Sequence, residues 1–199
     1  MMCPRQIEKS DLMEEPSELA ILGISGSGRK RSYNSALLEA AKQLLLQDAI
    51  LEVVDVSGLP LYNQDLEHDL PEEVKELKKK IRGADAILFA TPEHNYSITA
   101  VLKNAIEWGN RPPREASWSG KPAAIISAST GLRGGARAQL HLRQIMIDLN
   151  MLPINRPLLL VANAQDKFDE NLKLTDAESL QTLREVLSSL VEWTRKLQR

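Results

Sequence analysis

The segment Gly26–Asn34 combines the residue types that bind a phosphate group. It follows an apolar run, and its candidate phosphate ligands are Ser27, Arg29, Ser32 and Asn34. Backbone N–H groups at the start of a helix attract an anion, and an arginine adds a forked donor that is always charged. The spacing fits neither a P-loop, because Arg29 stands where lysine is required, nor the dinucleotide fingerprint, because Arg31 replaces its third glycine. The loop indicates a site for one phosphate monoester, and the alternative is a solvated Gly/Ser turn.

The segment Thr91–Ser97 offers groups that suit a planar heterocycle. Pro92 stiffens the exit from an apolar run, and Asn95 and Tyr96 can face the polar edge of a ring. The alternative is an Asn/Ser cap for the next helix. Histidine is a common acid–base residue, but no second His, Cys or Asp stands near His94 at a spacing that would make a triad or a metal site. We interpret His94 as a ligand contact, with no catalytic role.

The segment Ser129–Arg137 contains three glycines directly after another apolar run. Glycine lets the backbone approach a ligand closely, although the same residues also serve ordinary turns. Taken singly, this loop is a weak signal. Its meaning depends on whether all three segments meet at one place in the fold.

Alternating strand and helix patterns predict that they do meet. Five short apolar runs predict buried strands at 19–24, 51–56, 86–90, 123–129 and 158–161. Helical patterns follow each run, and Ser32 or Asn34 is expected to cap the first of these helices. Near-continuous apolar strands alternating with helices indicate a parallel sheet covered on both faces. Ligands of such sheets bind beyond the carboxyl ends of the strands, which is where the three segments begin.

Composition favours one folded domain of 199 residues with a net charge of -2, which indicates no nucleic-acid or membrane partner. Cys3 is the single cysteine and fits a cytoplasmic protein. We interpret residues 1–18 as a flexible extension and 19–199 as the folded domain. Trp108 and Trp193 are expected in the core or at an interface, His141 in a structural role, and Lys78–Lys80 on a solvated helix face.

Four ordered blocks make residues 19–199 resemble the NAD(P)H-dependent FMN reductases, whose members include chromate and quinone reductases. The blocks are Gly26–Asn34, Pro92–Ser97, Leu102–Trp108 and Gly134–Gln144. The resemblance implies a flavodoxin-like three-layer α/β sandwich with a five-stranded parallel sheet in the order 2-1-3-4-5. It also implies non-covalent FMN, with a phosphate held by Ser27, Arg29, Ser32 and Asn34. The isoalloxazine would be lined by Pro92, Glu93, His94, Asn95, Tyr96, Ser129 and Gly131. The chain departs from the family at His94, where tyrosine is usual, and at Gly28, where a larger residue is common.

The implied activity is hydride transfer from NADPH or NADH to FMN and then to a small acceptor such as a quinone, chromate, an azo compound or free flavin. The flavin carries this chemistry, so we assign no catalytic or metal-ligating side chain. Relatives form dimers and tetramers, and a homodimer or homotetramer is expected, with Asn110–Trp118 and the helix around His141 and Arg143 at its interface. The alternative is a flavodoxin-type electron carrier without reductase activity, although such carriers are strongly acidic.

Overall fold

The computed structural model describes residues 18–45 and 48–199, so that the predicted extension 1–18 lies outside the described residues except for Glu18. The strands are β1 (Leu19–Ser25), β2 (Ala49–Val54), β3 (Ala86–Ala90), β4 (Pro122–Ala128), β5 (Leu152–Pro153) and β6 (Leu159–Val161). The α-helices are α1 (Tyr33–Leu44), α2 (Glu72–Gly83), α3 (Ala100–Asn110), α4 (Ala136–Asp148) and α5 (Ala177–Leu197). Short 3-10 turns lie at Gln64–Leu66, Pro113–Glu115 and Ala164–Asp166.

The strands form one parallel sheet in the order β2-β1-β3-β4-β5, which confirms the predicted order. The predicted fifth strand, 158–161, forms as β6, and it is preceded by a two-residue strand, β5, which the sequence did not predict. β5 pairs with Pro122 and Ala123 at the start of β4, whereas β6 pairs with residues 126–128 at its end. Pro157 lies between the two segments, and a proline has no backbone N–H with which to continue a ladder.

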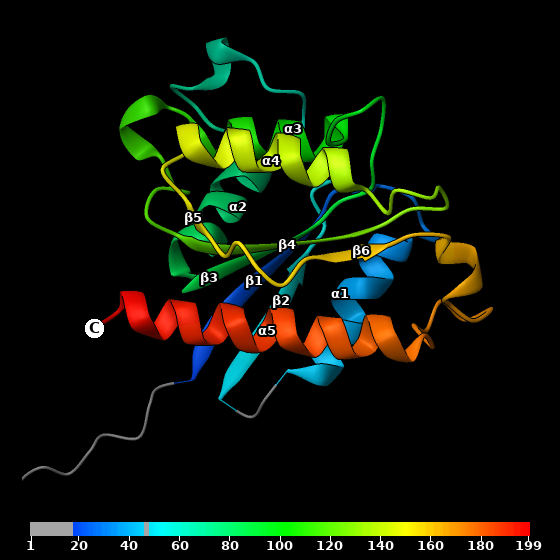
Figure 1. Cartoon of the computed structure of the whole chain (residues 1–199). Coiled ribbons are helices and arrows are strands. Elements are labelled where there is room, and N and C mark those ends of the chain that lie inside the picture. Colours follow the sequence, from blue (N-terminus) through cyan, green and yellow to red (C-terminus); the bar gives the residue numbers. More distant parts are fainter. Residues whose placement is uncertain (1–17, 46–47) are drawn as a thin grey trace, which may run out of the picture.

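Helices cover both faces of the sheet, with α1 and α5 on one side and α2, α3 and α4 on the other (Figure 1). Every residue of β3 and β4 is buried, as expected for central strands packed on both faces. Two apolar clusters fill the two layers between sheet and helices. Within the described residues, none of the helices combines the length and the apolar character needed to cross a membrane.

Two of the helices that start at the carboxyl ends of the strands, α1 and α3, begin at side-chain caps. Ser32 caps α1, because its hydroxyl accepts hydrogen bonds from the backbone N–H groups of Asn34 and Ser35, both at 3.2 Å. Thr99 caps α3 by accepting from the Leu102 N–H at 3.1 Å. Of the two predicted caps for α1, Ser32 is therefore the one that the fold uses.

One expectation about side chains is wrong, and the burial of one residue restricts a second. Lys78 does not belong to a solvated face, because its side chain is 2% exposed and its amine donates to the carbonyl oxygens of Arg111 and Glu115. Trp118 is fully buried inside the monomer, where its indole N–H donates to the Ile106 carbonyl at 3.0 Å. The interface role expected for Asn110–Trp118 therefore cannot involve this tryptophan.

Candidate functional site

The three predicted segments meet in one groove of about 370 Å³ at the carboxyl ends of β1, β3 and β4. The predicted residues that line it are Ser27, Arg29, Ser32, Asn34, Pro92, Glu93, His94 and Ser129. Thr99, Ala100, Val101 and Thr130 also line the groove and were not predicted as ligands. Thr99, Ala100 and Val101 follow the second segment at the start of α3, and Thr130 lies within the third segment, so their only signal in the sequence was this position. The predicted residues Asn95, Tyr96 and Gly131 do not line the groove and lie in the same loops at its border.

A larger hollow of about 500 Å³ lies elsewhere, against residues 20–22 of β1, Ile50 of β2 and Gly83 at the end of α2. It lies near the amino ends of the strands, away from the three polar loops. We assign the site to the smaller groove, because there the hydrogen-bond donors of three separate loops converge.

The turn after β1 is pinned to its neighbours on both sides. The Gly26 N–H donates to the Ala90 carbonyl at 2.7 Å, and the Gly26 carbonyl accepts from the Thr99 hydroxyl at 2.5 Å. A Cβ atom on Gly26 would lie 2.9 Å from Oγ1 of Thr91, so a side chain cannot be added without displacing Thr91, which directly follows β3. The loop is therefore held close to α3 and β3 before any ligand binds.

Asn34 connects the first loop to the third. Its side-chain amide donates to the Ala128 carbonyl at 2.9 Å and accepts from the Ala128 N–H, also at 2.9 Å. The side chain is buried and uses both of its polar atoms in this contact. Its predicted contact with a phosphate stays a prediction, whereas its structural role is to fasten α1 to the end of β4.

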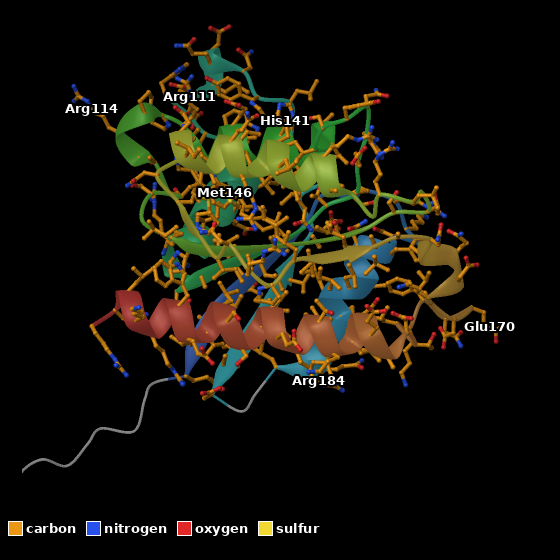
Figure 2. All side chains as sticks on the ribbon, viewed as in Figure 1. Arg111, Arg114, His141, Met146, Glu170 and Arg184 are labelled. Carbon is orange, nitrogen blue, oxygen red and sulfur yellow. The ribbon has the colours of Figure 1, made fainter. Side chains whose placement is uncertain are left out.

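Two arginines of the first loop differ in their surroundings. Arg31 donates to the Glu170 carbonyl at 2.6 Å, which ties the loop to the segment after Ala164–Asp166, where Figure 2 labels Glu170. Arg29 is exposed and lines the groove. Arg29 is thus the arginine of this loop that is placed to bind an anion.

The segment after β3 forms a tight turn. His94 and Ser97 exchange two backbone hydrogen bonds of 3.0 and 2.9 Å, and the residues between them have positive φ angles, 49° for Asn95 and 69° for Tyr96. Positive φ at both central residues is the signature of a type I′ turn. Asparagine tolerates this conformation, but it is uncommon for tyrosine, so the Tyr96 backbone needs support from its surroundings.

That support comes from α4. The Arg137 side chain donates to Oε1 of Glu93 at 2.5 Å, and its backbone N–H donates to Oε2 at 3.1 Å. Burial raises the pKa of Glu93, but the hydrogen bonds and charge of Arg137 outweigh it, so that this pKa is lowered overall. The Ser97 hydroxyl lies 2.6 Å from Nδ1 of His141. His141 points away from the sheet, on the side of α4 opposite Met146 (Figure 2). His141, predicted to be structural, thus contacts the turn.

Glycines shape the third loop. Gly135 precedes α4 with φ 89°, and a Cβ atom there would lie 2.7 Å from Cβ of Ser127. Two backbone hydrogen bonds fix Ser129. Its N–H donates to the Val161 carbonyl at 2.9 Å, and its carbonyl accepts from the Ala164 N–H at 3.0 Å. The Gly131 N–H donates to the Ser129 hydroxyl at 3.2 Å. Among the residues that the structure describes, no three metal-ligating side chains cluster together. The groove is lined by neutral polar residues, by the cationic Arg29 and by Glu93.

Comparison with known proteins agrees with this geometry. Residues 19–166 match the family described as NADPH-dependent FMN reductase. The chain is 47% identical over 181 residues to an NAD(P)H-dependent FMN reductase of Pseudomonas aeruginosa, covering 90% of this chain and 97% of that protein. It is 46% identical over 187 residues to an NAD(P)H:quinone oxidoreductase of Solanum tuberosum, covering 90% and 94%.

Solved structures show the same relationship. FerB, a flavoenzyme NAD(P)H:(acceptor) oxidoreductase from Paracoccus denitrificans, superposes with a TM-score of 0.83 at 32% identity, covering 89% of this chain and 98% of that one. A flavodoxin, WrbA-like protein from Agrobacterium tumefaciens has a TM-score of 0.59 at 15% identity over 90% of this chain and 99% of that one. The second likeness concerns the fold alone and confirms that it is flavodoxin-like. The chain belongs to the NADPH-dependent FMN reductase family.

Proposed function

We propose that the groove at the carboxyl ends of β1, β3 and β4 is the FMN site of this NAD(P)H-dependent oxidoreductase, and that quinones are its acceptors. The observation that carries the proposal is the convergence of three separate loops on this one groove. In parallel α/β sheets this edge is where ligands bind.

The residues of the groove fit the chemical parts of FMN. The amino end of α1, with Ser27, Arg29 and Ser32, matches a phosphate dianion in charge and in hydrogen-bond donors. Pro92, Glu93 and His94 with Ser129 form the other part of the lining, where the isoalloxazine would lie. Asn95, Tyr96 and Gly131 lie in the same loops, at the border of the proposed isoalloxazine site. The proposed ligands are therefore the residues that the sequence selected.

The bound FMN would supply the redox chemistry: it would take hydride from the nicotinamide and pass the electrons to the acceptor. The protein positions the reactants and stabilises negative charge with backbone N–H groups. Those of His94, Ser97, Ser129 and Gly131 already donate within the fold, which leaves Asn95, Tyr96 and Thr130 as the donors. Glu93 is an anchor in this scheme and not an acid, because Arg137 keeps its pKa low and its carboxylate ionised at neutral pH. His94 is exposed at the turn and forms a wall of the acceptor side.

The acceptor class follows from the named relatives. Relatives at 40–46% identity include an NAD(P)H:quinone oxidoreductase of Solanum tuberosum, an NADPH:quinone oxidoreductase of Arabidopsis thaliana and a protein of Oryza sativa subsp. japonica named 'Probable NADPH:quinone oxidoreductase 2'. A Burkholderia relative at 37% identity is a 2-hydroxy-1,4-benzoquinone reductase. We place quinones first, with chromate, azo compounds and free flavin as further acceptors. Arg133, exposed in the loop after β4, favours NADPH over NADH, because the additional phosphate of NADPH would gain a cationic partner.

We further propose a cytoplasmic homodimer or homotetramer. The outer face of α4 supports assembly, because Leu140 is 65% exposed and Ile147 is 80% exposed on the same helix. Arg143 contributes differently from what we expected, since its guanidinium donates to the Ile154 carbonyl of its own chain at 2.9 Å. The apolar residues of α4, and not Arg143, are the proposed interface residues.

The absorbance spectrum of the purified protein tests the proposed function. Flavin bands, or their appearance on addition of FMN, are expected, together with steady oxidation of NADPH when a benzoquinone is present. Flavin bands without NADPH or NADH oxidation would indicate the flavodoxin-type electron carrier. Failure to bind FMN at all would refute the assignment of the groove.

A further inference from the structure

One face of α3 carries polar side chains that do not line the groove. Asn104 donates to the Pro60 carbonyl at 2.9 Å and accepts from the Tyr62 N–H at 2.8 Å. Trp108, one turn later and fully buried, donates its indole N–H to the same Pro60 carbonyl at 2.7 Å. Three hydrogen bonds therefore fasten α3 to the segment 55–71, which joins β2 to α2 and which we call the β2–α2 connection.

Aromatic and charged contacts reinforce this attachment. The Tyr62 ring meets Trp108 edge to face at 5.1 Å between centroids, and its hydroxyl donates to Glu67 at 2.6 Å. The Arg111 guanidinium lies 5.7 Å from the centroid of the Tyr62 ring, and Figure 2 shows Arg111 beside this part of the chain. Without a long helix or strand of its own, the connection derives its position from α3.

The same connection touches the loop after β1. A Cβ atom built on Gly28 would lie 3.1 Å from Cβ of Ser57 and 3.9 Å from Cγ2 of Val101. Ser57 thus occupies the space that a larger residue at position 28 would need. Val101 precedes Asn104 by one turn of α3, so that the same face of this helix borders both the groove and the connection.

We propose that Asn104 and Trp108 are positioning residues for the phosphate loop: they hold the β2–α2 connection so that Ser57 packs against Gly28, between Ser27 and Arg29. The proposal rests on the proposed function in one respect, namely that this loop holds the FMN phosphate. It gives a function to the block Leu102–Trp108, which lies mostly outside the groove. Neither residue touches the ligand, so both act through the loop.

Hydrogen exchange of the flavin-free protein provides the first test. Trp108→Phe keeps the ring but removes its N–H donor, and should speed exchange of the backbone amides in residues 57–66. Trp118→Phe is the matched control, because Trp118 is equally buried and also donates one hydrogen bond, to Ile106, away from the connection. Trp108→Phe should also weaken FMN by about threefold to tenfold, the equivalent of one net hydrogen bond, with little change for riboflavin. Equal effects of both variants, on exchange or on FMN, would overturn the proposal.

A double-mutant cycle provides the second test. Gly28 does not have a left-handed φ, so that Gly28→Ala reports mainly on its contact with Ser57. The alanine should weaken FMN when the connection is held, and less so in the Asn104→Ala background, where Ser57 can move away. Ser57→Gly should restore affinity to Gly28→Ala. Additive effects of Gly28→Ala and Asn104→Ala would refute the proposal. If the unmodified protein bound no FMN, the groove assignment would fail instead, and the exchange experiment would still decide the role of Trp108.

Discussion

The Arg137 guanidinium lies over the Tyr96 ring, with its central carbon 3.6 Å from the ring centroid. Tyr96 has a positive φ that tyrosine seldom adopts, and Arg137 also binds Glu93 on the other side of the turn. The Tyr96 ring is exposed and the Arg137 side chain is half-buried, whereas the Glu93 carboxylate that binds Arg137 is buried. One guanidinium thus makes a cation–π contact with Tyr96 and a charge-assisted hydrogen bond to Glu93. The helix α4 therefore holds the turn that borders the flavin groove in an otherwise unfavourable conformation.

The Glu93–Arg137 pair predicts an acid-sensitive contribution to stability. The folded-state pKa of Glu93 is lowered, so its ionised form stabilises the fold above the pKa of an unfolded carboxyl, about 4.3. Glu93→Gln should therefore lower the unfolding midpoint most near neutral pH. The difference from the unmodified protein should shrink as the pH falls through the lowered pKa. Thermal unfolding at several pH values measures this, with the exposed Glu39→Gln as control; a difference independent of pH would contradict the prediction.

Arg29 should contribute to the binding of the FMN phosphate. Arg29→Ala is expected to weaken FMN by about 1.5–3 kcal/mol, the range of a charge-assisted hydrogen bond. Riboflavin, which lacks the phosphate, should lose much less. Fluorescence titration of both ligands measures the effect, with Lys30→Ala as the neighbouring control. Equal losses for FMN and riboflavin would place Arg29 away from the phosphate.

His94 should affect the choice of acceptor more than the reduction of the flavin. If His94 is a wall, His94→Tyr should keep FMN bound and preserve NAD(P)H oxidation within about tenfold, or about 1.4 kcal/mol in barrier. Relative rates with different quinones should change instead. If His94 were a general acid, His94→Tyr and His94→Gln would both slow acceptor reduction by about 10²–10⁴-fold. Stopped-flow measurement of the two half-reactions distinguishes these cases.

Lys78 should be more important for stability than its neighbours in the same charged run. Burial lowers the pKa of its amine, while Glu115 opposes that effect by its charge. Lys78→Ala leaves the carbonyls of Arg111 and Glu115 without this donor, and should cost about 2–3 kcal/mol in the free energy of unfolding. The exposed Lys79→Ala should change stability by less than about 0.5 kcal/mol. Urea denaturation of the two variants compares them, and equal stability would refute the structural role of Lys78.

Assembly should depend on the apolar residues of α4. The proposed dimer or tetramer would bury Ile147, so Ile147→Lys should lower the molecular mass in solution toward 22.2 kDa. Light scattering at micromolar concentration measures this mass. An exposed position on the opposite layer, Glu185→Lys on α5, serves as the control. A mass of 22.2 kDa for the unmodified protein would exclude the oligomer.

The sequence was most informative where local patterns have one physical meaning. The apolar runs at 86–90 and 123–129 became β3 and β4, because a run without polar alternation indicates burial on both faces. Ser32 and Asn34 were the two caps expected for α1, and the Ser32 hydroxyl is the one that accepts from backbone N–H groups within three residues. The convergence of the three loops followed from the parallel sheet alone, since each loop leaves a strand at its carboxyl end.

Polar contacts between distant segments depended on the tertiary structure. Asn104 meets Pro60 across 44 residues, and Arg137 meets Glu93 across the same separation. Lys78 shows the same limit, since a lysine in a charged run is normally solvated and is buried here only because the segment around Arg111 and Glu115 folds over it. Periodicity reports which face of an element is buried, but the partner of a buried polar group is decided by which loops come to lie beside it.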